Sequence, residues 1–220
     1  MRPSFVMAAL GGLLSGIFIS LPAIGSELKV KITKDMPFAE VTHKGSKVRI
    51  QRIQDTDNRL IDDFAKTSRP CPPFCIHPMS AAPGIETVGE LELIHFLTDK
   101  VTAGAGILVD ARMPKWFKSE TIPGSINIPF VVFNKDNPYM EKILLAMGAT
   151  KNKSGSWSYG KAKELVLFCN GPWCDQSPRA IKGLLEVGYP QQKIKYYRGG
   201  MNLWRLFGLT TVVSKKSVAE

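Results

Sequence analysis

The stretch LVLFCNGPWCDQSPRAIKGLL, residues 165–185, decides the fold of this chain. Its first four residues are apolar and predict a short buried strand that ends at Cys169. A helix is expected to follow, because Ser177 is a favourable N-cap residue and Pro178 suits the first position of a helix. The stretch therefore predicts a strand, a loop over residues 170–177 and a helix.

The position of Cys169 between the strand and the helix has a chemical meaning. A cysteine in this place faces unpaired backbone N–H groups and the positive end of the helix dipole. Both favour the thiolate, which is the nucleophilic form of cysteine. Free cysteine is also among the most frequently buried residues, so a plain packing role is the alternative at this point.

Composition and charge limit the classes of function. The 220 residues are 44% hydrophobic and 22% charged, as in a globular protein with one domain and a small appendage. The net charge of +10 favours anionic small molecules, acidic partners or membrane surfaces. The basic residues are scattered and form no run interleaved with aromatic residues, so we expect no nucleic-acid partner.

The N-terminus resembles an export signal. Arg2 precedes an apolar stretch over residues 5–21, and small residues follow, so residues 1–25 are predicted to be a signal peptide. The alternative is an uncleaved membrane anchor, because residues 6–24 are almost long enough to span a bilayer. In either case the rest of the chain is expected to be periplasmic or otherwise exported, where disulfides form.

Two segments precede the main domain. Residues 26–66 are predicted to form a small β extension, with strands at residues 28–32 and 48–53, where apolar and polar residues alternate. Residues 67–85 are rich in proline and are predicted to be an extended linker.

The linker carries two cysteines, Cys71 and Cys75. A disulfide is expected here, either between them or with the cysteines at 169 and 174. The alternative is a copper site, because His77 and Met79 would add ligands that copper prefers.

From residue 86 helices and strands alternate, which predicts an α/β fold with a mainly parallel sheet covered on both faces. Thr87 and Glu90 form an expected capping box for the first helix. The domain is predicted to cover residues 86–213, followed by a tail at 214–220. Outside the cysteine strand and its helix, the expected elements are helices at 88–99, 138–147 and after Gly199-Gly200, and strands at 107–109, 126–129 and 193–197.

Four segments of this domain resemble the rhodanese family, in the same order along the chain. Thr121 stands where the family usually has histidine. The segments are VDAR at 109–112, TIPGSINIP at 121–129, LFC at 167–169 and YRGGMNLW at 197–204.

The resemblance implies a five-stranded parallel α/β sheet and an enzyme that carries sulfane sulfur as a persulfide on Cys169. The donor would be thiosulfate, a polysulfide or a protein persulfide, and the acceptor a thiol; no cofactor or metal is implied. Asp110 and Arg112 would be supporting residues that order the loops around the site, and Arg179 on the following helix would supply the positive charge that the loop itself lacks. The loop that binds the substrate would consist of Asn170, Gly171, Pro172, Trp173, Asp175, Gln176 and Ser177.

The loop also departs from the family pattern. Seven residues separate Cys169 from Ser177, where about five are usual, and Asp175 stands where a basic residue is common. Cys174 is a possible resolving thiol for a persulfide on Cys169, or the partner in an inert disulfide. Three functions follow: a sulfurtransferase, a thiol–disulfide redox protein on the same scaffold, or a non-catalytic binding module that holds copper.

Overall fold

The computed structural model describes residues 28–213. The expected signal peptide or anchor and the tail at 214–220 lie outside the described residues. Within residues 28–213, no helix is long and apolar enough to cross a membrane.

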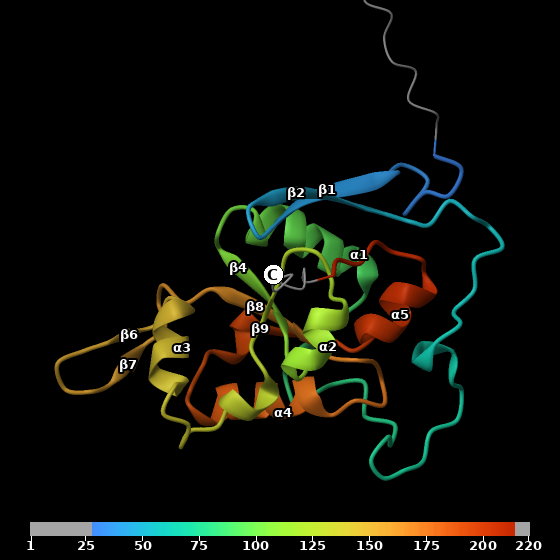
Figure 1. Ribbon diagram of the computed structural model, residues 1–220. Helices are drawn as coiled ribbons and strands as arrows, with labels where there is room; N and C mark the ends of the chain where they lie inside the picture. Colours follow the sequence, from blue (N-terminus) through green and yellow to red (C-terminus); the bar gives the residue numbers. More distant parts are fainter. Residues whose placement is uncertain (1–27, 214–220) are drawn as a thin grey trace, which may run out of the picture.

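The core is a parallel sheet of five strands (Figure 1). Its order is β3 (Glu86–Val88), β9 (Ile194–Tyr197), β8 (Glu164–Phe168), β4 (Gly106–Asp110) and β5 (Ser125–Asn127).

Two apolar clusters cover the two faces of this sheet, and strand β8 contributes to both. Leu165 and Leu167 belong to one cluster, and Val166 and Phe168 to the other, because successive side chains of a strand point to opposite faces. The first face is covered by α3 (Met140–Ala146) and α4 (Gln176–Glu186). The second is covered by α1 (Glu90–His95), its π-helical continuation η2 (Phe96–Val101) and α5 (Gly200–Leu206). The predicted α/β class and parallel sheet are confirmed.

The N-terminal extension packs on the second face and shares its core. Its hairpin consists of β1 (Phe38–His43) and β2 (Ser46–Gln51). Val41 and Ile50 are buried in the same cluster as α1 and α5. The second predicted strand is thus confirmed. The first is wrong, because residues 28–32 form no strand and Val30 bonds instead to the Gln54 side chain.

The linker follows the surface of the domain without regular secondary structure in residues 67–85. A single 3₁₀ turn, η1 (Asp63–Ala65), precedes it. Cys71 and Cys75 are joined in a disulfide. Arg198, at the end of β9, donates hydrogen bonds to the carbonyl oxygens of His77 and Pro78 at 2.8 and 3.1 Å. The linker is therefore fastened to the sheet end where Cys169 lies.

Several local predictions need correction. Thr87 does not cap the first helix: it lies in β3, and Gly89 is the N-cap, with its N–H donating to the Glu92 carboxylate at 3.1 Å. The helix predicted at 138–147 is confirmed as α3, and the strand predicted at 193–197 as β9. Further elements that were not predicted are β1, η1, β3, α2 (Pro114–Ser119), β6 (Thr150–Lys151), β7 (Trp157–Ser158), η3 (Phe130–Val132) and η4 (Gln191–Lys193).

Candidate active site

Cys169 follows the last residue of β8 and faces the first turn of α4. Its side chain is buried, and the Ser177 hydroxyl donates a hydrogen bond to its Sγ at 3.1 Å. The carbonyl oxygen of Cys174 lies 3.2 Å from the same sulfur and accepts a hydrogen bond from the thiol when Cys169 is protonated. Cys174 is also buried, and both cysteines are free thiols. The two cysteines predicted to act together therefore lie close to each other in the protein interior.

The helix begins earlier than predicted. Asp175 is the N-cap of α4, and Ser177 lies inside the first turn, where its hydroxyl contacts Cys169 instead of capping the helix. Only residues 170–174 then separate Cys169 from the N-cap. The expectation of an unusually long loop is therefore wrong, because it assumed that Ser177 was the cap.

The two thiols differ in acidity. Burial by itself would raise the pKa of Cys169, but hydrogen bonds from the Cys174 thiol, the Ser177 hydroxyl and the N–H groups of Ser177 and Gly171 outweigh it, so the pKa of Cys169 is lowered. The pKa of Cys174 is raised by its burial, by its hydrogen bond to Cys169 and by the negative charge there. The enclosure therefore favours a thiolate on Cys169 and a proton on Cys174.

The segment at the Gly199-Gly200 turn is joined to the active-site loop by backbone hydrogen bonds. Met201 N–H donates to the Cys169 carbonyl at 3.0 Å, and Asn202 N–H donates to the Asn170 carbonyl at 2.8 Å. Gly200 has φ +55°, and a Cβ there would lie 2.4 Å from the Cys169 carbonyl oxygen. This close backbone approach requires glycine.

Behind the loop lies a buried charge network. Arg112 pairs with Asp110 through hydrogen bonds of 2.9 and 2.7 Å, and both side chains are fully buried. Arg112 also donates to Asn170 Oδ1 at 3.2 Å, and Thr121 donates to Asp110 at 2.8 Å. The network thus reaches the loop through Asn170, and a supporting role of Asp110 and Arg112 in the reaction stays a prediction.

A cavity of about 320 Å³ lies in front of the loop. One wall comes from the loop itself and from the start of α4. The other comes from the segment 63–74, which spans the end of the predicted extension and the start of the predicted linker. The lining residues are Asn170, Trp173, Cys174, Asp175 and Gln176 on the first wall, Asp63, Phe64, Arg69, Pro73 and Phe74 on the second, and Trp116 of α2.

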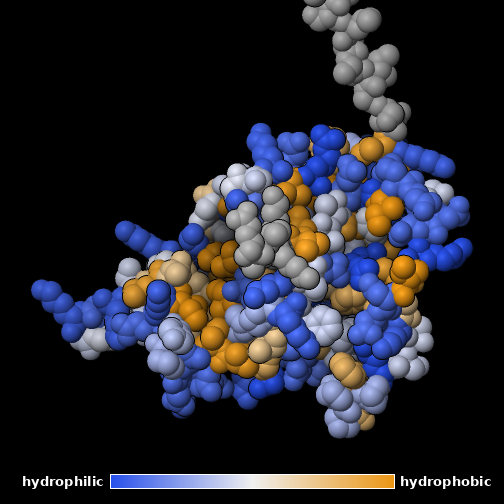
Figure 2. Space-filling model, viewed as in Figure 1, coloured by the Kyte–Doolittle hydropathy of each residue, from blue (hydrophilic) through white to orange (hydrophobic). Residues whose placement is uncertain are grey.

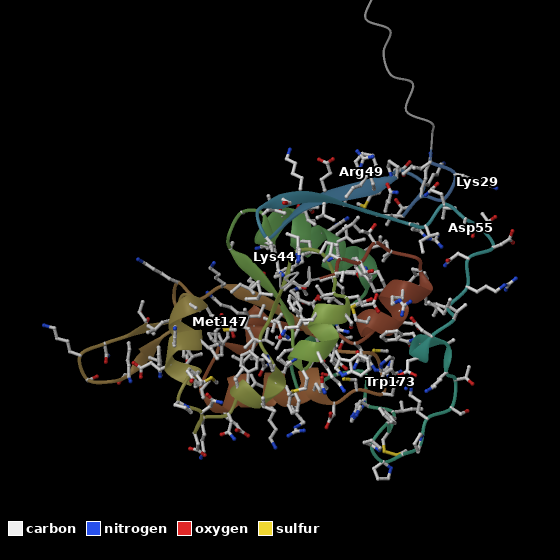
Figure 3. The ribbon with its side chains drawn as sticks, in the orientation of Figure 1. Lys29, Lys44, Arg49, Asp55, Met147 and Trp173 are labelled. Carbon is white, nitrogen blue, oxygen red and sulfur yellow. A yellow bond between two sulfur atoms is a disulfide. The ribbon has the colours of Figure 1, made fainter. Side chains whose placement is uncertain are left out.

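Trp173 joins the two walls. Its ring meets the Phe74 ring edge-on at 5.6 Å between centroids, and the Arg69 guanidinium lies 4.1 Å from its ring centroid. In Figure 3 Trp173 lies beside the linker that carries the disulfide. His77 N–H donates to the Pro172 carbonyl at 2.9 Å, which adds a backbone tie between linker and loop.

Arg69 is the residue that sequence reasoning missed. The sequence offered Arg179 as a cation near the loop, but its guanidinium lies 4.4 Å from the Phe130 ring centroid and 3.8 Å from Asp175, and it does not line the cavity. Arg69 is distant in sequence from Cys169, and only the folded linker brings it to the cavity. A cation next to a run of prolines was the one available signal.

The copper alternative is wrong for this structure. The disulfide consumes the thiols of Cys71 and Cys75, the two ligands on which the copper site depended. Among residues 28–213, no group of three or more His, Cys, Asp or Glu side chains is placed to hold a metal ion.

The chain was compared with known protein families, curated proteins and solved structures. A family model for the rhodanese-like domain matches residues 94–206, more than half of the chain. Among solved structures, the BH2092 protein from Bacillus halodurans is 22% identical, with a TM-score of 0.42, over 61% of this chain and 82% of that one. A rhodanese with anions from E. coli is 25% identical, with a TM-score of 0.33, over 50% of this chain and 99% of that one. A human single-domain sulfurtransferase is also 25% identical, with a TM-score of 0.38, over 55% of this chain and 95% of that one. No curated protein matches the sequence. The family match therefore places this chain in the rhodanese-like domain family.

Proposed function

We propose that this protein is a sulfurtransferase that carries sulfane sulfur as a persulfide on Cys169. The observation that carries this proposal is the buried Cys169 sulfur, which accepts a hydrogen bond from Ser177 and has a lowered pKa at the start of α4. A thiolate is the form that attacks sulfur. The family match supports the same reaction class.

Loading takes one displacement. The Cys169 thiolate attacks the outer sulfur of a donor such as thiosulfate, a new S–S bond forms, and the bond between the outer sulfur and the rest of the donor breaks. The leaving group, sulfite in the case of thiosulfate, departs with the bonding electron pair. Negative charge moves to the terminal sulfur, where the backbone N–H groups of the first turn and the Ser177 hydroxyl stabilise it.

Unloading has two routes. The thiolate of an acceptor can attack the terminal sulfur, which gives an acceptor persulfide and restores the Cys169 thiolate. Alternatively, the Cys174 sulfur attacks the Cys169 sulfur, which gives a Cys169–Cys174 disulfide and hydrosulfide, with the Cys174 proton leaving on the hydrosulfide. The contact between the two thiols favours this second route as the origin of a thiol–disulfide redox function.

Intact-protein mass spectrometry tests the proposal. The reduced protein is exposed to thiosulfate or polysulfide, and peptide mapping locates any added sulfur. We expect one sulfur on Cys169 and none in Cys169→Ser, while Cys174→Ser still loads but releases less hydrosulfide. Rapid formation of a Cys169–Cys174 disulfide without loading by either donor would favour the redox function instead.

Export of the protein is part of the proposal. The Cys71–Cys75 disulfide supports it, because disulfides persist mainly in oxidising compartments. Cell fractionation of the full-length chain, with N-terminal sequencing of the product, distinguishes a cleaved signal after Gly25 from a membrane anchor. Recovery of the uncleaved chain in the cytoplasm would contradict export.

A further inference from the structure

A buried tyrosine lies beside the active-site cysteines, on the face of the sheet that α4 covers. Tyr196 belongs to β9, its register partner in β8 is Leu167, and both side chains lie in the apolar cluster under α4 (Figure 1). Cys169 follows Leu167 by two residues, so the alternation of side chains along the strand turns it to the same face. The sheet therefore places Tyr196 next to the candidate nucleophile.

Helix α4 brings Ser177 to the same place. Residues 180–181 of α4 pack in the cluster that contains Tyr196, and Ser177 precedes them by three and four residues, on the same face of the helix. The Ser177 hydroxyl and the sulfurs of Cys169 and Cys174 all interact electrostatically with the Tyr196 hydroxyl. These four side chains thus form one buried polar group within an apolar cluster.

Two members of this group have complementary hydrogen-bonding capacity that is not used. Tyr196 is only 1% exposed, and its hydroxyl is buried without a hydrogen-bond partner. The Ser177 hydroxyl donates its single proton to Cys169 Sγ at 3.1 Å, and within residues 28–213 its oxygen accepts no hydrogen bond in return. A buried donor without an acceptor is unfavourable. Such a donor here lies next to an oxygen that can accept its proton.

We propose that Tyr196 is a positioning residue that stabilises the Cys169 thiolate through Ser177. When Cys169 is ionised, the Tyr196 O–H donates to the Ser177 oxygen and the Ser177 O–H donates to the sulfur. The bond from Tyr196 holds the Ser177 proton on the sulfur side, and hydrogen bonds in such a chain strengthen one another. No proton is transferred along the chain, so Tyr196 supports the nucleophile without contacting the sulfur donor.

Tyr196 remains a donor over the pH range in which Cys169 ionises. Among the charged and titratable groups of the described chain, those that act on its hydroxyl are Cys169, Cys174 and Arg198. Burial is the main cause that raises the pKa of Tyr196, followed by the two cysteines, while Arg198 and the Ser177 hydroxyl lower it by less. The phenol therefore stays protonated while the thiol titrates.

The pH dependence of iodoacetamide alkylation of the reduced full chain tests the proposal, with peptide mapping to follow Cys169 alone. Tyr196→Phe removes one oxygen and keeps the ring that packs in the core. We expect the alkylation midpoint of Cys169 to rise by about 0.5 or more on the pH scale, because a hydrogen bond that supports the thiolate is lost. Below the midpoint, sulfur loading should also be slower, a consequence that rests on the proposed function of Cys169.

The next residue of the same strand supplies the matched control. Tyr197 is equally buried, but it points to the opposite face of the sheet, where its hydroxyl donates to the Glu90 carboxylate at 2.9 Å. Tyr197→Phe should leave the midpoint of Cys169 unchanged. Urea denaturation checks the fold: Tyr196→Phe should be no less stable than the wild type at a pH where Cys169 is protonated, since its hydroxyl has no partner to lose.

A double-mutant cycle separates action through Ser177 from a merely structural role. In the Ser177→Ala background the connecting hydroxyl is gone, so Tyr196→Phe should cause no further rise of the midpoint. A structural effect of the tyrosine on the active-site loop would instead give the same rise in both backgrounds.

An unchanged midpoint in Tyr196→Phe, an equal rise with and without Ser177, an equal rise in Tyr197→Phe, or a loss of stability in Tyr196→Phe would each overturn the inference. Alkylation requires no sulfur donor. A wild-type protein that does not load sulfur, but shows the expected midpoints, would therefore overturn the proposed function and keep the hydrogen-bond chain.

Discussion

The molecule contains two cysteine pairs with similar spacing, on opposite sides of one cavity, and in opposite states. Cys169 and Cys174 are buried, reduced and held by hydrogen bonds at the start of α4. Cys71 and Cys75 lie in the linker and form a disulfide, with the Cys71 end exposed to solvent. The spacing of the cysteines alone would not distinguish the proposed sulfur carrier from a structural disulfide.

The difference lies in the surroundings of the sulfur atoms. In the buried pair, hydrogen-bond donors surround Cys169 and lower its pKa, while burial raises the pKa of Cys174. The negative charge is therefore favoured on Cys169. The linker pair has no comparable enclosure, and its bridge closes a short loop that includes Phe74, the ring that meets Trp173. One pair is arranged for reaction and the other for holding a wall of the cavity.

The largest expected effect separates the two pairs directly. Cys169→Ser should reduce sulfur loading by at least about a thousandfold, since the nucleophile is lost, while Cys71→Ser combined with Cys75→Ser retains most of the loading. Stopped-flow release of sulfite from thiosulfate measures the rates. Equal losses in both proteins would contradict the division of roles.

A change beneath the loop should damage the buried pair alone. Gly200→Ala places a Cβ against the Cys169 carbonyl at positive φ, so we expect a loss of about 2–3 kcal/mol in the free energy of unfolding. Urea denaturation measures it. Gly45→Ala is the matched control: Gly45 also has positive φ (+79°), but nothing lies near its added Cβ, so its loss should be smaller.

Removal of the linker disulfide should have a smaller effect on stability. The bridge closes a loop between residues only four apart, so chain entropy limits its contribution to about 2 kcal/mol. Urea denaturation of the double serine variant should therefore show at most this loss. A substantially larger loss would mean that the linker supports the core and not only the cavity wall.

The smallest effect concerns the acidity of Cys169. Because the pKa of Cys169 is lowered, its thiolate persists below the pH at which an ordinary thiol ionises, and is lost as the pH falls through this lowered pKa. Ser177→Ala removes one of the stabilising donors and should move the pH midpoint of iodoacetamide alkylation upward. Ser119→Ala, whose hydroxyl bonds to Trp116 on α2, is the control and should leave the midpoint unchanged.

Much of the fold could be predicted from local patterns. The apolar run before Cys169, the alternation of helices and strands, and the Gly-Gly turn each depend on neighbours in sequence, and each was confirmed. The strand at residues 28–32 was wrong, because alternation does not reveal whether a partner strand exists. The hairpin pairs residues 38–43 with 46–51 through a Lys44-Gly45 turn in which both residues have positive φ.

Only the part of the site that comes from one continuous stretch of sequence could be predicted. The cysteines and the loop follow from one stretch, but the second wall depends on contacts between distant segments, such as Arg198 with the His77 carbonyl. Ser177 was misassigned because serine and aspartate are both good N-cap residues, and only the structure decides between Ser177 and Asp175. Arg69 had only its place next to a run of prolines as a local signal, and the folded linker is what brings it to the cavity.

The face of the molecule seen in Figure 2 is mostly hydrophilic, with apolar groups between the charged ones.

The second wall of the cavity comes from residues before the matched family domain, while Cys169 lies within that domain. The second wall of the cavity and the candidate nucleophile thus belong to separate parts of the chain. If Cys169 carries sulfur as proposed, exchange of residues 63–74 for another sequence would change the wall of the cavity and leave the nucleophile as it is.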